Sequence, residues 1–351
     1  MSSRRKPPTL DYAAAAQISL AEKLKPFRWL FWPVGAVMPL LTFIGIAGNG
    51  AAPGVYEALI HLPVLAAWLL SAYGWGCLLS WVGQTFLSVS AVDTQDNGGD
   101  RQECLSYRKT EALVTVTTIA AGLGAMSLTI LGLGLIGAFN RPVAIAMVLL
   151  GVVIAVTAIV KRKPKVTPQV GFGHWPWLLM MPSLAMVILC ALLPAGLLWG
   201  MDEPNGYDVV EYHLQVPREW YEAGHVFALH HNVYSFFPFN VEMHYLLGMH
   251  LMGGPWAGQF LAQLMHAAYM ALFVVSVYAT VRPWGQGRAM IAGLLAAAPP
   301  WVPLLASIAY DEGGFLLYGT LAIGWALRVL SSSSPSPGIP GEGRVRVLFP
   351  G

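Results

Sequence analysis

The stretch 120–139, AAGLGAMSLTILGLGLIGAF, contains no charged residue and matches a bilayer crossing in length. Roughly 20 apolar residues are needed for one helical span of the hydrocarbon core. Small residues recur along the stretch at helical spacing, a composition typical of helices that pack closely on other helices. It therefore predicts a membrane-spanning helix with a tightly packed face.

The rest of the chain has the same character. Of its 351 residues, 56% are hydrophobic and 11% are charged. A soluble domain of this length needs more charge to cover its surface, so most of the chain is expected to face lipid. Backbone groups in lipid must be satisfied internally, and no strand-like alternation extends across a membrane. The sequence predicts an all-α, multi-pass integral membrane helix bundle with membrane lipids as its surroundings and no nucleic-acid partner.

About eight transmembrane helices are expected, with a shorter apolar segment between the fifth and sixth. The predicted spans are 29–48, 57–82, 112–139, 143–160, 176–199, 256–281, 289–308 and 313–330. The first four belong to an N-terminal membrane region, 29–165, and the last four to a second membrane region, 176–330. The second region includes an outer loop of interfacial helices, 200–255.

Two terminal segments flank the membrane regions. The polar segment 1–28 is expected to be cytoplasmic, and the apolar run after it is longer than a signal-peptide core, which favours an uncleaved anchor. The segment 331–351 is rich in Ser, Pro and Gly and is expected to be a disordered tail.

Basic residues orient the predicted spans. With the N-terminus in the cytoplasm, 18 of the 20 Lys and Arg residues fall on the cytoplasmic side, and only Arg141 and Arg218 do not. An excess of Lys and Arg marks cytoplasmic loops. The sequence therefore predicts a multi-pass protein of the cell (inner) membrane with a cytoplasmic N-terminus.

The cytoplasmic loop 83–110 differs from its surroundings. It contains an alternating run, TFLSVSAV, a turn-like DNGG and a high density of charge. These features favour a surface loop, with a hairpin as one form. An inserted segment is the alternative interpretation.

The outer loop carries an acidic stretch, GYDVVEYHLQVPREWYEAG, at 206–224. In a helix, Asp208, Glu211, Tyr212 and Gln215 would share one polar face. Long loops of this kind tend to carry function. A solvated acidic loop is the plainer interpretation, but a carboxylate at the mouth of a bundle is also well placed to act as a general base.

This stretch resembles the first outer loop of the GT-C glycosyltransferases, a superfamily that includes protein O-mannosyltransferases and lipid A aminoarabinose transferases. The later FFPFNVEMHYLLGMHLMGG, 236–254, is similar to the second half of that loop. ASIAYDEGGFLLYGTLAIGWAL, 306–327, looks like the second acidic position of the superfamily. The resemblance covers roughly 176–330, and relatives commonly continue further, which implies a chain truncated at its C-terminal end.

The resemblance implies a reaction. A membrane glycosyltransferase of this type moves a sugar, a hexose or a pentose, from a polyprenyl-phosphate donor to an acceptor on the outer face. It implies Asp208 as the general base, with Asp311 and Glu312 as further catalytic residues. It also suggests substrate binding by Glu211, Tyr212, Arg218 and Glu242.

Histidines suggest a second kind of site. Candidate ligands for a divalent metal are His213, His230, His231 and His244. Imidazole suits zinc, although the spacing of these residues is not a zinc signature. No cofactor is otherwise expected.

Two other classes of function stay open. A non-catalytic, truncated relative would keep the fold without turnover. A transporter would need polar groups within the spans, where the sequence has little beyond His61 and His266.

Overall fold

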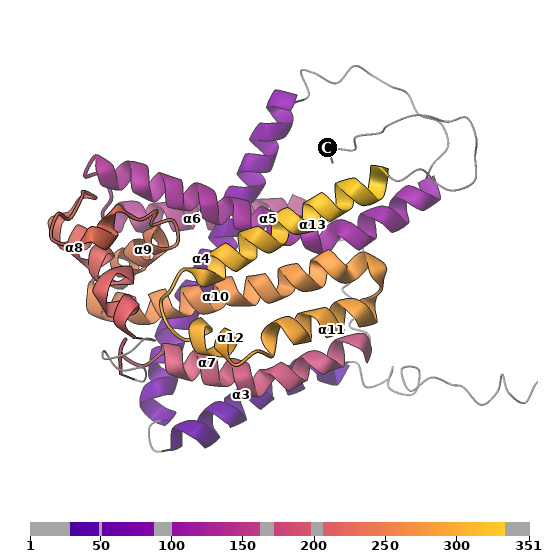
Figure 1. Cartoon of the computed structure of the whole chain (residues 1–351), viewed down its shortest axis with the longest axis horizontal. Coiled ribbons are helices and arrows are strands. Elements are labelled where there is room, and N and C mark those ends of the chain that lie inside the picture. Colours follow the sequence, from indigo (N-terminus) through magenta and orange to yellow (C-terminus); the bar gives the residue numbers. More distant parts are fainter. Residues whose placement is uncertain (1–28, 49–50, 88–99, 162–171, 198–205, 334–351) are drawn as a thin grey trace, which may run out of the picture.

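The computed structural model describes residues 29–48, 51–87, 100–161, 172–197 and 206–333, and the fold is described for these ranges. All regular elements in them are helical (Figure 1). The expected all-α class is therefore confirmed. The segment 1–28 and most of the expected disordered tail lie outside the described residues.

The described residues contain eleven α-helices, joined in places by short 3₁₀ or π turns. The α-helices are α3 (Phe31–Ala47), α4 (Ala51–Leu87), α5 (Asp100–Leu135), α6 (Arg141–Lys161), α7 (Met181–Ala191), α8 (Gln215–Ala223), α9 (Glu242–Met252), α10 (Pro255–Val281), α11 (Gln286–Ala297), α12 (Trp301–Ala306) and, ending the described chain, α13 (Glu312–Ser333). The short turns are η4 (Phe172–Met180), η5 (Val209–His213), η6 (Val233–Phe236) and η7 (Arg282–Trp284).

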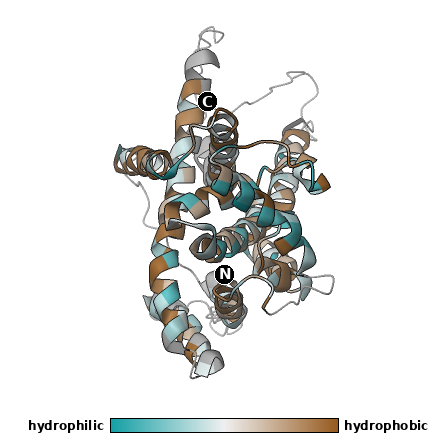
Figure 2. Cartoon of the chain, turned by 90° about the vertical axis from the view of Figure 1, so that its left-hand side faces the viewer, coloured by the Kyte–Doolittle hydropathy of each residue, from teal (hydrophilic) through white to brown (hydrophobic). Residues whose placement is uncertain are grey.

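Five of the helical segments are long and apolar enough to cross a membrane. They are Pro53–Val82, Ala112–Leu135, Arg141–Lys161, Pro255–Trp284 and Glu312–Leu330. Five of the eight predicted spans are thus confirmed by length and composition. Hydrophobic residues occur along these helices (Figure 2), and large ones such as Leu59, Val153 and Phe315 are exposed, as lipid contact requires.

The predicted span 289–308 is wrong as a single helix. The structure divides it into α11 and α12, with Pro299 and Pro300 at the break. Proline lacks a backbone N–H and its ring clashes with the preceding helical turn, so two adjacent prolines end a helix.

Two further predicted spans are shorter than expected. The span 29–48 corresponds to α3, which stops before Gly48, a residue at φ 51°. Glycine adopts a positive φ without strain because it has no Cβ atom, and a residue in this conformation ends a helix. The span 176–199 is the 3₁₀ turn η4 followed by α7, which ends at Ala191, before Pro194.

The loop predicted at 83–110 is shorter in the structure. Its first residues belong to α4, which ends at Leu87, and its last belong to α5, which starts at Asp100. The alternating run therefore begins in a helix instead of a strand. The remainder, 88–99, lies outside the described residues.

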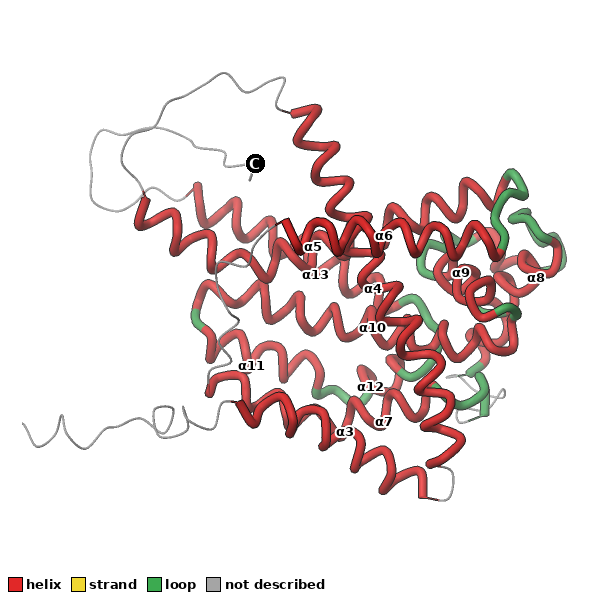
Figure 3. Tube along the Cα trace, turned by 180° about the vertical axis from the view of Figure 1, so that it is seen from behind, coloured by secondary structure: helices red, strands yellow, loops and turns green. Residues whose placement is uncertain are grey.

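Helix α10 is central to the bundle, since it contacts α4, α5, α7, α9, α11, α12 and α13. Helices α3 and α7 pair beside it, while α4 crosses the other long helices at a steep angle (Figures 1 and 3). Side chains of α10 tie these parts together. Gln263 Nε2, for example, donates to the Ala191 and Leu193 carbonyls at 2.9 Å, satisfying groups that the end of α7 leaves free.

The opening stretch packs closely, as predicted, at the crossing of α4 and α5. A Cβ atom added to Gly122 would lie 1.7 Å from the Ala72 carbonyl oxygen, so only glycine allows this approach. Gly132, in the same helix, has nothing within 4 Å. The glycine pattern thus marks a packing contact over part of the helix.

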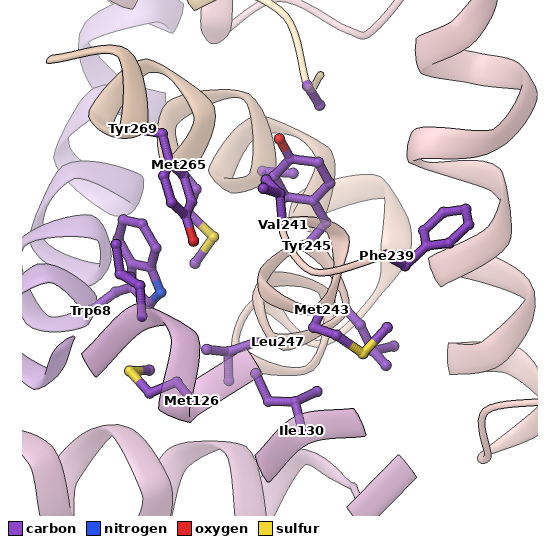
Figure 4. Packing of buried hydrophobic residues seen from close by; sticks show 14 of the residues in the cluster. Trp68, Met126, Ile130, Phe239, Val241, Met243, Tyr245, Leu247, Met265 and Tyr269 are labelled. Atoms are coloured by element: carbon purple, nitrogen blue, oxygen red, sulfur yellow. The ribbon is translucent and has the colours of Figure 1, made fainter. Parts of the chain in front are cut away.

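The buried core lies where α4, α5, α9 and α10 meet (Figure 4). It includes Trp68, Tyr245 and Tyr269, all fully buried. The indole N–H of Trp68 donates to Nδ1 of His244 at 3.1 Å, and Nε2 of His244 lies 3.1 Å from the Leu123 carbonyl oxygen. His244 is therefore a hydrogen-bonded core residue that joins three helices.

Candidate active site

One end of the bundle is built from segments far apart in the sequence (Figures 1 and 3). Helix α9 packs there on α5, α6 and α10, and α8 packs on α9. The Val226 N–H donates to the Gly134 carbonyl at 2.9 Å. The Tyr245 hydroxyl donates to the carbonyl of Tyr310, just before α13. The parts predicted to face the outer side thus meet at one end.

The turn η5 positions the acidic residues of the loop. The Leu214 N–H donates to the Val209 carbonyl at 2.9 Å, across five residues, which makes this a π turn. Such turns re-aim side chains and are frequent at functional sites. The predicted polar face is half buried and comprises Asp208, Glu211, Tyr212 and Gln215.

The charges of Asp208 and Asp311 both affect the pKa of Tyr212. The pKa of Tyr212 lies well above its ordinary value, first because the side chain is half buried and next because the charges of Asp208 and Asp311 disfavour a phenolate. Burial and then the charge of Asp208 likewise raise the pKa of Tyr310 to about 12. The structure therefore brings the two predicted acidic positions into one cluster, and their catalytic roles remain predictions.

Glu312 lies beside Asp311 at the first residue of α13. Its Oε2 atom is buried and has no hydrogen-bond partner among the described residues. The next residue, Gly313, donates its N–H to Nε2 of His266 at 3.0 Å. His266 in turn donates from Nδ1 to the Leu305 carbonyl at 2.9 Å, which anchors the start of α13 to α10.

The closest side-chain contact in this region joins His213 to Glu242. Nδ1 of His213 lies 2.6 Å from Oε1 of Glu242, and both residues are buried, at 4% and 3% exposed. Burial raises the pKa of Glu242, while the hydrogen bond and charge of His213 act in the opposite direction. Oε2 of Glu242 has no hydrogen-bond partner in the described part of the chain.

Aromatic rings surround His213. Its ring centroid lies 4.2 Å from that of Tyr212 and 5.1 Å from that of Tyr310, and Tyr212 stacks on Tyr234 at 4.6 Å. Sequence reasoning missed Tyr310 and Tyr245 as members of this region. The signal available was an aromatic residue near an acidic one in AYDEGG and in EMHY.

The other predicted substrate-binding residues are placed differently. Arg218 is 54% exposed and forms an ion pair with Glu222 at 2.9 Å on α8. It lines a separate cavity of about 460 Å³ with Trp256 and Gln259. Glu211 is half buried, and its charge raises the pKa of the neighbouring Tyr207. Of the predicted binding set, Tyr212 and Glu242 belong to the cluster with Asp208 and Asp311.

The four candidate metal ligands do not converge. His213 is bound to Glu242, and His244 is held by Trp68 and Leu123 in the core. His231 is exposed and lies 2.9 Å from Glu219. Over the described ranges, no group of three or more His, Cys, Asp or Glu side chains could hold a metal ion. The predicted histidine set is therefore not brought together as one site.

An apolar cavity opens beside Asp311. Its volume is about 350 Å³, and it lies between α5, α13 and the chain just before α9. Leu128 and Phe315, at 66% and 79% exposed, stand at its border with the surroundings of the bundle. The full lining is Gly124, Leu128, Pro238, Asn240, Val241, Asp311, Gly314, Phe315 and Tyr318.

The five apolar helices and their exposed hydrophobic side chains indicate a multi-pass helical membrane protein with a carboxylate and tyrosine cluster at one end. Comparison of the chain with family models, curated proteins and solved structures gives no match. The resemblance to GT-C glycosyltransferases therefore stays a prediction that rests on the residues themselves.

Proposed function

We propose that this protein is a membrane glycosyltransferase that moves a sugar from a polyprenyl-phosphate donor to an acceptor hydroxyl. The supporting observation is that the charges of Asp208 and Asp311, far apart in the sequence, both affect Tyr212, and that Asp311 also lines an apolar cavity. Carboxylates clustered at a cleft are candidates for acid–base chemistry.

Asp208 is the base of the proposed reaction. The acceptor oxygen forms a bond to the anomeric carbon of the sugar while the bond from that carbon to the phosphate oxygen breaks. The hydroxyl proton passes to the Asp208 carboxylate, and polyprenyl phosphate leaves with the bonding electron pair. Because the phosphate is already a good leaving group, one positioned base is sufficient.

The cavity beside Asp311 suits a lipid-linked donor. Its lining is mainly apolar and its border residues Leu128 and Phe315 are exposed on helices that carry apolar outer faces. A polyprenyl chain could enter sideways from lipid between α5 and α13 while its phosphate-linked sugar reaches Asp311. Lateral entry keeps the long apolar chain out of water throughout.

The orientation of the protein completes the proposal. The junction of α10 and α11 and the end of α13 lie at the end of the bundle opposite α8 and α9 (Figure 1). Arg282, Arg288 and Arg328 belong to those parts. By the distribution of basic residues we place that end in the cytoplasm and the carboxylate cluster on the outer side of the cell membrane.

The test compares three forms of the full chain in membranes supplied with polyprenyl-monophosphate sugars, hexose and pentose. We expect wild-type protein to release polyprenyl monophosphate and Asp208→Asn to release none, because an amide cannot accept the proton. Glu222→Gln, a change at an exposed carboxylate on α8, is the matched control and should retain wild-type turnover. Equal turnover by Asp208→Asn and wild type would exclude Asp208 as the base.

The same assay separates the alternatives. A non-catalytic relative would release nothing in the wild-type form with any of these donors. The two histidines within the predicted spans do not favour transport, because both ring nitrogens of each are engaged by backbone groups. Those of His61 lie against the Glu57 and Ala257 carbonyls, and those of His266 against the Leu305 carbonyl and the Gly313 N–H.

A further inference from the structure

We propose that Asn240 recognises the sugar of the lipid-linked donor, its carboxamide binding one sugar hydroxyl while the Asp311 carboxylate accepts a hydrogen bond from another. This role rests on the proposed function and deepens it, since it names the site that distinguishes a glycosylated lipid from the bare lipid phosphate. Asn240 is then a substrate-binding residue that takes no part in the proton transfer.

Both side chains are open to the cavity beside α13. Asn240 and Asp311 belong to its lining and both are exposed, so a ligand in the cavity reaches them without rearrangement. Neither side chain forms a hydrogen bond or an ion pair with another residue in the described part of the chain. Their polar atoms are therefore available to a ligand.

The backbone at Asn240 is held in place from both sides. Its neighbours Phe239 and Val241 are buried and point to opposite sides of the segment (Figure 4), and Oγ of Ser127 donates to the Asn240 carbonyl at 2.7 Å. A Cβ atom added to Gly314 would lie 2.6 Å from Cγ2 of Val241, so the segment packs directly on the first turn of α13. A polar group that is fixed in advance loses little freedom when a ligand binds.

The polar side chains stand at one end of the cavity, where α13 begins. Phe315 and Tyr318 line it about one and about two turns further along the helix. Gly124 of α5 lies at the level of Tyr318, since a Cβ atom added to it would lie 3.6 Å from the tyrosine oxygen. That oxygen already donates to the Ala120 carbonyl at 2.9 Å. A sugar therefore fits the end beside Asp311, and the isoprene units next to the phosphate fit the apolar part.

A structural role does not account for the Asn240 carboxamide. Asn232 uses both polar atoms of its carboxamide, and Oδ1 of Asn140 accepts an N–H in the first turn of α6 at 3.2 Å. At the start of α9, backbone carbonyls already accept the N–H groups of Met243 and His244, so Asn240 does not cap this helix. A carboxamide at an apolar, lipid-bordered cavity is costly without a polar partner. A ligand that carries hydroxyl groups supplies that partner.

The chemistry of the two side chains suits hydroxyl groups. A carboxylate accepts hydrogen bonds only, whereas a carboxamide both donates and accepts them. A sugar hydroxyl does both, so Asp311 and Asn240 can each bind one. Bare polyprenyl phosphate has no hydroxyl to place there, so the difference in affinity between the two lipids measures this site.

The experiment measures the binding of three lipids to the full chain in lipid nanodiscs. They are undecaprenyl phosphate, undecaprenyl phosphate glucose and undecaprenyl phosphate arabinose. Wild-type protein should bind at least one sugar lipid about fiftyfold more tightly than undecaprenyl phosphate, the combined size of one neutral hydrogen bond and one to a carboxylate. Asn240→Ala should reduce this preference about fivefold, the size of the neutral bond, and leave the affinity for undecaprenyl phosphate unchanged.

Two results would overturn the inference. Equal wild-type affinity for all three lipids is the first, and this measurement needs no variant to fold. The second is an Asn240→Ala protein that binds undecaprenyl phosphate like wild type and keeps the full preference for the sugar lipid.

Gly124→Leu tests whether the lipid occupies this cavity. The added side chain would extend into the apolar part beside Tyr318, so all three lipids should bind about tenfold more weakly. Gly132→Leu is the matched control, because Gly132 belongs to the same helix but does not line the cavity. It should bind like wild type. Wild-type affinity of Gly124→Leu for the three lipids would place the donor elsewhere and overturn the inference.

Binding needs no turnover, so the proposed function can fail separately. A sugar preference that depends on Asn240, without release of polyprenyl phosphate in the transfer assay, would remove the transferase and keep the sugar site. Transfer by wild-type protein, with an unchanged preference in Asn240→Ala, would remove the role of Asn240 alone.

Discussion

Nδ1 of His213 lies 2.6 Å from Oε1 of Glu242, a contact that joins η5 to α9 between two side chains that are almost fully buried. A buried pair of this kind is costly to break at one end, because the partner left behind stays desolvated and unpaired. The contact therefore affects both the stability of this end of the bundle and the charge of the candidate site.

The first prediction concerns the energetic coupling of this pair. Changing His213→Ala should destabilise the protein by about 3 kcal/mol, since Glu242 is then buried alone. The double variant with Glu242→Leu should lose less than the sum of the two single changes, because neither charge is left behind. Reversible unfolding of the protein in detergent would measure both effects. Strict additivity of the two losses would contradict the coupling.

The second prediction is a pH dependence of stability. Burial raises the pKa of Glu242 above the ordinary value of 4.5. The folded state therefore holds this proton more tightly than the unfolded state does. The stability that this bound proton gives the folded state is fully present below pH 4.5. It is lost as pH rises through the raised pKa of Glu242 in the folded protein.

Thermal unfolding of wild type and Glu242→Gln, measured below and above pH 4.5, would test whether stability falls with rising pH. The wild-type curve should fall more steeply than that of the variant just above pH 4.5, because glutamine carries no titrating group. A wild-type protein that instead gains stability relative to Glu242→Gln with rising pH would show that the pKa of Glu242 is lowered.

The third prediction tests the crossing of α4 and α5. Gly122→Ala should destabilise the protein by about 1–3 kcal/mol, the usual cost of overpacking, because the added Cβ would meet the Ala72 carbonyl at 1.7 Å. Gly132→Ala is the control in the same helix, since its Cβ would meet nothing within 4 Å. It should leave stability unchanged or raise it slightly. Equal effects of the two variants would argue against the close crossing.

The fourth prediction concerns topology. Reporter fusions after Lys165 and after Leu330 should report cytoplasm, and a fusion after Gly224 should report the outer side, because basic residues concentrate in the predicted cytoplasmic parts. The double change Arg288→Gln and Arg328→Gln would test how strongly the orientation of the C-terminal spans depends on these two charges. An outer location for the Lys165 fusion would reverse the proposed side of the carboxylate cluster.

Much of the fold could be predicted from local composition. Uninterrupted apolar runs identified α5, α6, α10 and α13, because lipid exposure demands apolar side chains along a whole helix. The run at 289–308 was equally apolar but contains Pro299 and Pro300, and hydropathy alone did not reveal that these residues end the helix. The charged stretch 100–110 looked like a loop, yet it continues α5 as a helix.

The candidate site was only partly predictable. Asp208 and Asp311 stood out because carboxylates are rare in so apolar a chain. The sequence did not reveal that both charges affect the pKa of Tyr212 or that Arg218 lines a separate cavity. Both relationships depend on how distant segments fold together. Sequence spacing carries no information about such distances unless both residues lie on one helix.

The sequence by itself determined that this protein is helical and apolar over most of its length. It also identified the acidic residues predicted to lie together on one side of the membrane. These properties are local, because each helix must satisfy its own backbone groups and expose apolar side chains to lipid. Only the tertiary structure decided that His213 meets Glu242 and that His244 belongs to the core. Those partnerships arise from packing between α4, α5, α9 and η5, where burial in a low-dielectric interior makes the choice of partner decisive for every polar group.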